Sequence, residues 1–186
     1  MFKRVESEWE LTMFNSIWTT VWKEKNYELE YSASALERYV ALSNEGEYVG
    51  CAEYKRYEPG SSSMESVIDV RQHPLIAANL CSIGEIEKMA VLMQYRGHPL
   101  ADLLSSAVQC AEKHQIRYYL ALLEPIFYRA LRITFHVPME RLGEKAFYKG
   151  DYVIPTLIRV EEVYNNKSQY DWLVLQDDPS KPGIKQ

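Results

Sequence analysis

The sequence predicts an α+β fold, and three observations lead to this prediction. Strand-like segments alternate along the chain with segments in which apolar residues recur every three to four positions, as on one face of a helix. Short turns join two pairs of strand candidates, but another pair is joined through a helix candidate at residues 100–114 and should be parallel. The 186 residues suffice for one core. We therefore expect one domain over residues 1–176, with a mixed central sheet of about six or seven strands flanked by about four helices.

The N-terminal region is expected to form a short strand and a helix. Residues 2–5 are a strand candidate, and Ser7 is a typical helix cap with acidic residues on both sides. Apolar side chains then lie on one helical stripe as far as Trp22, and the helix should end near Asn26. Core packing is the expected role of the aromatic residues on this stripe.

A hairpin and a less regular segment come next. Strand candidates at residues 38–43 and 48–57 are separated by four residues that include Asn and Gly, which favours a hairpin. After a loop rich in Pro, Gly and Ser, residues 64–71 are predicted to form a short helix that ends before Pro74. Residues 75–82 give no clear prediction.

The C-terminal half is expected to begin with a buried strand and a helix. Residues 116–123 are almost wholly apolar and aromatic, which is typical of an inner strand. Glu124-Pro125 should open a helix, since Pro is favoured in a first turn. The side chains expected to point inward from this helix are Ile126, Ala130, Leu131 and Ile133.

Two further strands and a polar tail complete the prediction. Strand candidates at residues 139–148 and 152–163 are linked by Lys-Gly-Asp, a typical hairpin turn. Pro155 should lie at a sheet edge or a bulge, because it cannot donate a ladder hydrogen bond. Residues 171–176 are expected to pack as a short extra element, and residues 177–186 to be a disordered tail.

The most informative stretch lies in the middle of the chain. A strand candidate ends at Met93, a turn with Arg96 and Gly97 follows, and from Leu100 the apolar residues have the spacing of an amphipathic helix that Pro99 suits as a start. The first N–H groups of a helix lack internal partners and bind anions. The stretch therefore suits a phosphate, with an added charge from the arginine, although an ordinary strand-to-helix turn would show the same pattern.

The motif Val91-x-x-x-Tyr95-Arg96-Gly97-x-x-Leu100-Ala101 resembles the acyl-CoA loop of GCN5-related N-acetyltransferases. The family pattern there is Gln/Arg-x-x-Gly-x-Gly/Ala, and this chain has Gln94, Arg96 and Gly97 in place but Pro99 at the second Gly or Ala position. Proline offers no N–H to a phosphate. The resemblance implies an acetyl-CoA or acyl-CoA co-substrate. The residues that it places at this co-substrate are Met89, Ala90, Val91, Gln94, Arg96, Gly97, His98, Leu100 and Ala101.

The same resemblance implies an architecture and a reaction. The order of elements agrees with this family over most of the chain, although the sharp motif spans only about a dozen residues. In this fold the central strand and the next one splay apart, the thioester lies in the gap, and the first helix and the loop after it flank the cleft. The implied activity is an N-acyltransferase that moves an acetyl or longer acyl group to a primary amine. A non-catalytic sensor or scaffold of the same fold is an alternative, and so is a protein–protein module with exposed aromatics.

Glu85 and Glu87 are the candidate general bases. They alternate with Met89 and Val91, so all four side chains are expected on one face of the strand. A partly buried carboxylate can have a raised pKa, which suits a base, although both could also be solvated groups at a sheet's end. In histone-modifying members of the family the catalytic Glu stands at about the place of Glu85, which favours that residue.

Tyr128 is the candidate general acid. Several family members use a Tyr in the pattern Leu-Tyr-x-x-x-Gly-Phe, in the helix after the next strand. If Phe135 takes the place of the final Phe, Ala130 stands where the Tyr should be, and Tyr128 lies about 200° away round the helix. Packing is therefore the alternative role for its side chain.

Other positions at which this chain differs from the common family pattern resemble one branch of the family. Glu85-x-x-Lys88-Met89-x-Val91 is similar to the Glu-x-x-Arg-Phe-x-Val signature of acyl-homoserine-lactone synthases. The start of the chain and the segment Gly150-x-x-Val153-x-Pro155 look like the related long-chain N-acyl amino acid synthases. These take the acyl group from acyl carrier protein, an acidic partner that would need a basic patch. The candidates for that patch are Arg96, Lys113, His114 and Arg117.

Composition and charge argue against several other classes of protein. A net charge of −5 with no basic stripe argues against nucleic-acid binding. Three cysteines far apart and scattered histidines give no disulfide framework and no familiar metal motif, so no metal is expected. The sequence shows neither a signal peptide nor an apolar run long enough for a membrane span, and a cytoplasmic location is expected. The acceptor is expected to be a small amine or an amino acid, and a homodimer is left open.

Overall fold

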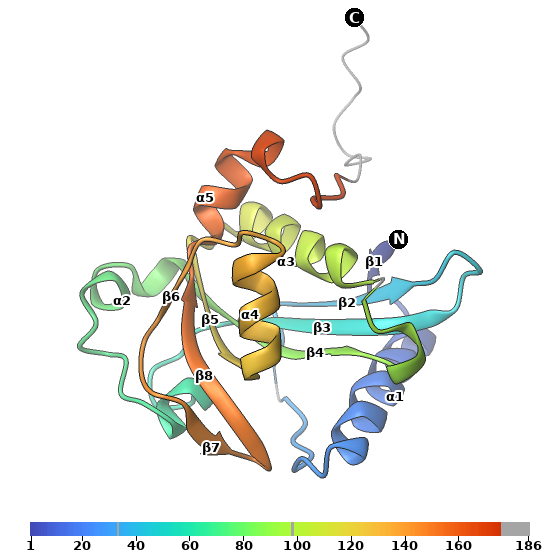
Figure 1. The fold of residues 1–186 in the computed structure, drawn as a ribbon, viewed down its shortest axis with the longest axis horizontal. Coiled ribbons are helices and arrows are strands. Elements are labelled where there is room, and N and C mark those ends of the chain that lie inside the picture. Colours follow the sequence, from blue (N-terminus) through green and yellow to red (C-terminus); the bar gives the residue numbers. More distant parts are fainter. Residues whose placement is uncertain (33, 98, 176–186) are drawn as a thin grey trace, which may run out of the picture.

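The computed structural model describes residues 1–32, 34–97 and 99–175. An eight-stranded mixed sheet has the strand order β1-β2-β3-β4-β5-β8-β6, with β7 also paired to β8 (Figure 1). The strands are β1 (Phe2–Arg4), β2 (Glu37–Leu42), β3 (Tyr48–Arg56), β4 (Ile83–Val91), β5 (Tyr118–Leu123), β6 (Met139–Arg141), β7 (Ala146–Tyr148) and β8 (Asp151–Ile158). The α-helices are α1 (Glu8–Glu24), α2 (Pro74–Ala78), α3 (Leu100–His114), α4 (Pro125–Ile133) and α5 (Val160–Asn165). The predicted α+β class is confirmed; within the described residues the sheet has one strand more than the upper prediction.

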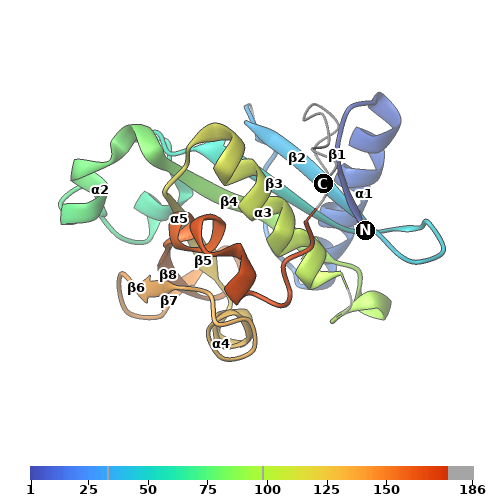
Figure 2. The ribbon, with the colours of Figure 1, turned by 90° about the horizontal axis from the view of Figure 1, so that it is seen from above.

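The sheet lies between two helical layers. On one face α1 packs Phe14 and Trp18 against a cluster that includes Val40 and Ala90 of the sheet. On the other face lies α3, with α4 and α5 beside it, over the larger core cluster (Figure 2). No helix in the described part of the chain is long and apolar enough to cross a bilayer.

The cap of α1 is where the sequence predicted it. The Ser7 hydroxyl accepts a hydrogen bond from the Glu10 N–H at 3.2 Å, and the Glu10 carboxylate accepts one from the Ser7 N–H at 3.1 Å. This reciprocal capping box satisfies N–H groups at the start of the helix. The helix ends at Glu24, close to the predicted end.

The predicted parallel crossover is formed by β4, α3 and β5. β4 pairs with β5 in parallel register at three residue pairs, from Ile83 with Tyr118 to Glu85 with Leu120. Beyond Glu85 the ladder stops, although both strands continue. The two strands therefore open a gap in the middle of the sheet.

A β-bulge at Lys88 changes which face of the sheet the following side chains of β4 point to. In the register with β3, Glu87 pairs with Glu53 and Ala90 pairs with Cys51, which leaves two β4 residues opposite one β3 residue. Lys88 lies in the left-handed region with φ 49°. The expected shared face of Glu85, Glu87, Met89 and Val91 is therefore wrong: the extra residue shifts the alternation, and the two carboxylates face away from Met89 and Val91.

The segment after β3 differs from its prediction. Instead of a helix over residues 64–71, a 3₁₀ helix spans only Ser63–Ser66, with Ser62 as its cap. The short helix α2 forms later, where the sequence gave no clear prediction, with Pro74 as its first residue. Pro74 thus starts a helix rather than only ending one, as its fixed φ permits.

Two predictions for the C-terminal half also need correction. On α4, Leu131 is buried as expected, but Ile126 and Ile133 are 85% and 56% exposed, because a single helix face meets the core. The strand predicted to reach residue 163 ends at Ile158, and α5 follows with Val160 and Val163 buried at helical spacing.

The last hairpin is interrupted. The predicted strand over residues 139–148 is split into β6 and β7, which pair with residues 156–158 and 151–153 of β8. Pro155 lies opposite this break, so its missing N–H leaves no ladder bond unmade, in agreement with the prediction of a bulge or edge. In the final segment Trp172 and Leu173 pack against the core and Leu175 is exposed. The predicted tail at 177–186 lies outside the described residues.

Candidate active site

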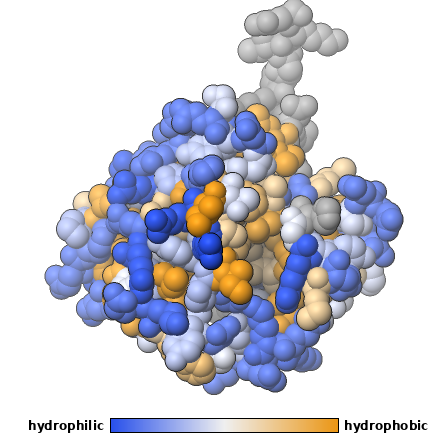
Figure 3. Space-filling model, viewed as in Figure 1, coloured by the Kyte–Doolittle hydropathy of each residue, from blue (hydrophilic) through white to orange (hydrophobic). Residues whose placement is uncertain are grey.

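A cleft of about 1570 Å³ opens between the splayed strands. Its walls are residues 85–91 of β4, residues 120–123 of β5, the start of α4 and the loop after α1. The space-filling view shows apolar side chains in a hollow on this face, with hydrophilic side chains around it (Figure 3). The structure therefore contains the gap in which the resemblance places a thioester.

The start of α3 lies at one end of this cleft. The first described hydrogen bond of the helix runs from the Leu103 N–H to the Pro99 carbonyl, and no side chain caps the helix. The amides of the first three helical residues therefore have no partner inside the helix. Gly97, with φ +100°, turns the chain into this position. Such an N-terminus attracts an anion.

Arg96 adds positive charge at the same end. Its side chain is exposed, lines the cleft, and makes no hydrogen bond or ion pair with the described residues. The neighbouring Tyr95 is held by a hydrogen bond from its hydroxyl to Glu47 in the β2–β3 turn. Of the other predicted co-substrate residues, residues 89–91 and Leu100 line the cleft, whereas the exposed Gln94 and the half-buried Ala101 do not. His98 lies outside the described residues.

Glu85 lies at the opposite end of the cleft, where β4 and β5 still pair. Its side chain is 3% exposed, and it accepts a hydrogen bond from the Ser62 hydroxyl. Its second oxygen lies 3.0 Å from the Lys55 ammonium nitrogen but outside hydrogen-bonding geometry, so it remains unsatisfied. Burial raises the pKa of Glu85, and the contacts with Ser62 and Lys55 oppose that rise without cancelling it.

Glu87 differs from Glu85 in its partners. Its carboxylate lies 2.9 Å from the Lys55 ammonium and accepts a hydrogen bond from Ser63 at 3.1 Å. Burial acts to raise the pKa of Glu87, but the hydrogen bond and charge of Lys55 outweigh it, and the pKa lies below its usual range. Of the two candidate bases, only Glu85 has a pKa shifted upward, which is the direction that suits a general base.

A second buried ion pair supports the bulge of β4. The Lys88 ammonium lies 2.8 Å from the Glu53 carboxylate, whose other oxygen accepts from Arg38 at 2.6 Å. The Lys88 ammonium also donates to the Ser32 hydroxyl, which in turn donates to Glu53. Lys88 is thus fully engaged, and its role is to hold the strand in its bulged course beside Trp18.

Contacts across the mouth of the cleft were not foreseen from the sequence. The Lys25 ammonium contacts Glu124, and the Tyr27 hydroxyl donates to Glu124 at 2.9 Å, with Asp151 at 3.2 Å. These residues are about 100 positions apart or more, so no local pattern could connect them. Burial, followed by the charge of Glu124, raises the pKa of Tyr27 well above its ordinary value.

Tyr128 is not brought to the cleft. It is partly buried against the main core, whereas its neighbours Phe127 and Ala130 line the cleft. This agrees with the packing role that the sequence left open. Among the described tyrosines, Tyr27, Tyr31 and Tyr148 do line the cleft.

The predicted basic patch is not formed. Lys113 and His114 end α3 and contact Glu37, whereas Arg96 precedes that helix, roughly 20 Å away along its axis. Arg117 is paired with Glu161 at 2.7 Å. Only Arg96 of the four lines the cleft.

A narrow apolar space continues from the cleft into the core. Its volume is about 30 Å³, and apolar side chains provide its lining. Ile86, Met89, Leu123 and Phe127 line both this space and the cleft, and Trp172 forms a part of its wall that the cleft does not share. The Trp172 indole donates to the Phe135 carbonyl at 2.8 Å, which fixes that wall.

Comparison of the sequence finds no relative: no family model and no curated protein matches this chain. Solved structures do match. An acetyltransferase of the GNAT family from Staphylococcus aureus has a TM-score of 0.55 at 12% identity, covering 86% of this chain and 98% of its own. The chain therefore has the GCN5-related N-acetyltransferase fold, as the acyl-CoA loop predicted.

The predicted branch resemblance is also confirmed at the level of the fold. The N-acyl amino acid synthase FeeM from uncultured soil microbes has a TM-score of 0.70 at 15% identity, covering 87% of this chain and 91% of FeeM. The CoA-dependent acyl-homoserine lactone synthase BjaI, solved with MTA, has a TM-score of 0.62 at 13% identity, covering 96% and 94%. At these identities the likeness establishes the fold and leaves the chemistry to the residues of this chain.

Proposed function

We propose that this protein is an N-acyltransferase that moves an acyl group from a thioester to a primary amine. The observation that carries the proposal is the course of the cleft. It runs from an uncapped helix N-terminus with an unpaired arginine to a buried carboxylate of raised pKa. A phosphate-bearing donor needs the first feature, and an amine that must lose a proton needs the second.

CoA is the proposed carrier of the acyl group. Its pyrophosphate would meet the amides at the start of α3 and the Arg96 guanidinium, and its thioester arm would lie in the gap beyond Glu85. An acyl carrier protein would bring a single phosphate on an acidic surface. Lys113, His114 and Arg117 lie at or just beyond the far end of α3, outside the cleft lining, and this favours CoA over that donor.

The acyl group is proposed to be longer than acetyl. The apolar space bounded by Trp172 begins at the part of the cleft lined by Met89 and Phe127. An alkyl chain entering there would leave water for an apolar lining, worth roughly 0.8 kcal/mol per CH₂. The names of the synthases among the structural neighbours agree with such a donor.

The acceptor is proposed to be a small amine or amino acid that enters on the acidic side. Glu30, Glu58, Glu85 and Glu87 line this part of the cleft, which suits a cationic substrate. Glu85, directly or through one water, takes the proton from the ammonium group. The amine nitrogen then attacks the thioester carbonyl carbon, the C–S bond breaks as the C–N bond forms, and the nitrogen loses a second proton, which the CoA thiolate takes.

A non-catalytic acyl-CoA binder is the second candidate. Pro99 removes one amide from the donor end, and Tyr128 does not line the cleft to serve as the acid. The first change removes one contact with the donor phosphate, and the second removes the candidate general acid, so binding without turnover is a possible outcome.

Two measurements test the proposal. Acyl-CoAs of increasing chain length should raise the melting temperature, because they bind the folded state. Incubation with a panel of amines should then give a new amide, detected by mass spectrometry, and free CoA in equal amount. Binding without turnover would select the non-catalytic alternative, and the absence of any thermal shift would remove both.

A further inference from the structure

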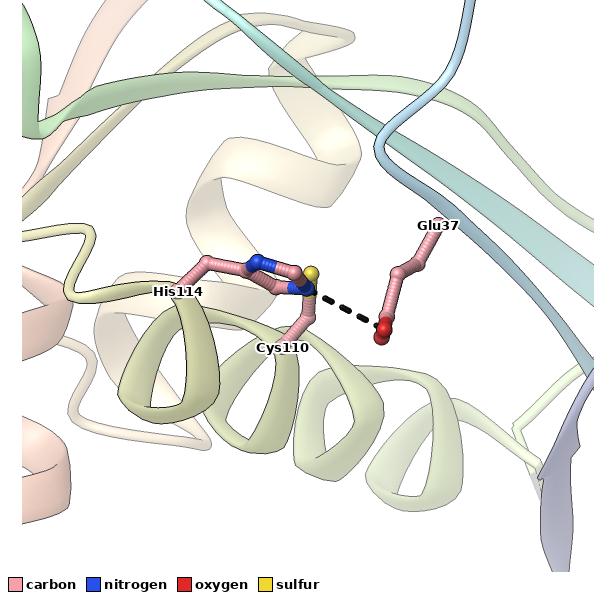
Figure 4. Close-up of side chains that lie close together, drawn as sticks. All are labelled: Glu37, Cys110 and His114. Atoms are coloured by element: carbon pink, nitrogen blue, oxygen red, sulfur yellow. Dashed lines mark ion pairs between the residues drawn. The ribbon is translucent and has the colours of Figure 1, made fainter.

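Three side chains that commonly ligate metals meet under the last turn of α3. Cys110 and His114 are one helical turn apart on α3, and Glu37 begins β2 beside them (Figure 4). The Cys110 sulfur, one His114 nitrogen and a Glu37 oxygen all lie within 4.8 Å of one another. None of the three lines the cleft, so the proposed acyl transfer does not account for them.

Burial distinguishes this cluster from ordinary surface groups. The Cys110 and Glu37 side chains are 0% and 4% exposed, and that of His114 is 23% exposed. His114 Nε2 lies 3.1 Å from a Glu37 oxygen, yet this buried atom makes no well-formed hydrogen bond in the described structure. A ring nitrogen is therefore directed at a carboxylate and a sulfur without being satisfied by either.

The cluster already attracts cations. The Lys113 ammonium and, at 3.5 Å, the Arg4 guanidinium contact the Glu37 carboxylate, and the Tyr39 hydroxyl donates to it at 2.6 Å. The Lys113 and Arg4 side chains are 48% and 45% exposed. They reach Glu37 from the solvent side, and both have long flexible stems that can withdraw. Lys113 thus occupies a position at Glu37 that another cation could take.

We propose that Glu37, Cys110 and His114 form a binding site for Zn²⁺. Sulfur, imidazole nitrogen and carboxylate oxygen are the donor atoms that zinc uses in proteins, whereas Ca²⁺ and Mg²⁺ favour sites made of oxygen alone. Two ligands from one helical turn and a third from a neighbouring strand would join α3 to β2. Water would complete a four-coordinate site.

Binding of Zn²⁺ must release the thiol proton of Cys110 and break the ion pair between Lys113 and Glu37. Cys110 is a free, buried cysteine, and a thiol must lose its proton to become a zinc ligand. Zn²⁺ forms the Zn–S bond as that proton leaves to solvent, and the Lys113 ammonium moves from Glu37 into water. Net charge at the ligands then balances: two anionic ligands face a doubly charged ion.

The decisive experiment measures zinc bound to the purified chain carrying Cys81→Ser, which removes the exposed thiol. We expect one zinc ion per chain after dialysis. The melting temperature should rise by roughly 5–10 °C at a hundredfold excess over Kd. Co²⁺ used as a probe should give the ultraviolet charge-transfer band of a cobalt–sulfur bond. If no zinc is retained, or if the cobalt complex lacks that band, the proposal is wrong, and no further substitution is needed to show it.

Matched substitutions locate the ion. Cys110→Ser and His114→Asn should each abolish retention, whereas Cys51→Ser, which also alters a buried thiol, and His73→Asn should not. Lys113→Met removes the competing ammonium and should tighten binding. Zinc retained by both Cys110→Ser and His114→Asn would place the ion elsewhere, and loss of zinc only in Cys51→Ser would do the same.

Discussion

The two halves of β4 carry opposite chemistry on one strand. Before the bulge, Glu85 and Glu87 contact Lys55 and the adjacent serines Ser62 and Ser63 of the segment after β3. After it, Met89 and Val91 pack on the other face, against the core beneath α3. A regular strand would place all four side chains on one face. One inserted residue thus allows a single strand to present carboxylates on one face and apolar side chains on the other, beside the proposed acceptor and donor sites.

The largest effect is expected from changing Glu85 at the polar end of β4. Glu85→Gln keeps the shape of the side chain and removes its basicity, so turnover should fall at least about 100-fold with little change in donor affinity. The loss should shrink at high pH, where the amine deprotonates unaided. Steady-state kinetics across pH would measure this.

Glu87→Gln is the matched control for Glu85, because it changes the neighbouring carboxylate whose pKa is lowered. It should affect turnover much less. If Glu87→Gln abolishes turnover and Glu85→Gln does not, the strand is right and the assigned base is wrong.

A substitution at the start of α3, where the donor phosphate is proposed to bind, should change CoA affinity and leave turnover nearly unchanged. Arg96→Ala removes a charged contact with phosphate and should weaken CoA binding by roughly 1.5–3 kcal/mol, with kcat nearly unchanged at saturation. Calorimetric titration with CoA measures this. Arg129→Ala, an exposed arginine on α4 outside the cleft lining, is the control. Equal affinities in both variants would remove the phosphate site from the start of α3.

The apolar space should set the chain length of the donor. Trp172→Leu replaces a large lining side chain by a smaller one and enlarges the space, so longer acyl chains should gain roughly fourfold in affinity for each further CH₂ that becomes buried. Competition binding with a series of acyl-CoAs of increasing chain length measures this preference. Trp9→Leu, at an exposed tryptophan, is the control. A length preference identical in the two variants would show that acyl chains end elsewhere.

The smallest expected effect is on stability. Because the pKa of Glu85 is raised on folding, its contribution to stability falls as pH rises through the window between its ordinary and folded values. The lowered pKa of Glu87 gives the opposite sign, with stability lost as pH falls. The melting temperature of Glu85→Gln relative to the parent should therefore increase with pH, and that of Glu87→Gln should decrease. Thermal scans from about pH 2 to 7 would span the windows on both sides of the ordinary glutamate value, and parallel curves for the two variants would contradict this difference.

Local signals in the sequence predicted local features. Ser7 lies three residues before Glu10, and this spacing alone encodes the capping box. Gly97 and Leu100 likewise belong to one turn and the helix start that follows it, so this turn could be predicted from neighbouring residues. The fold class followed from the order of such segments.

Features made by distant residues could not be predicted in this way. Lys88 adopts a positive φ because Glu53 and Trp18, far away in sequence, hold its side chain, and nothing in the residues around it marks a bulge. The contact of Tyr27 with Glu124 and the meeting of Glu37 with His114 likewise depend on how strands pair across the sheet. Such sites require the tertiary structure.

The short ladder between β4 and β5 has a consequence for hydrogen exchange. Only three residue pairs join the two halves of the sheet, so amides of β4 beyond Glu85 that point into the gap have no strand partner there. Their protons should exchange at a low opening free energy, unlike those of the β2–β3 hairpin. A ligand arm that carries amide groups would supply the missing partners as an added strand does, and its binding should be visible as slowed exchange at residues 89–91.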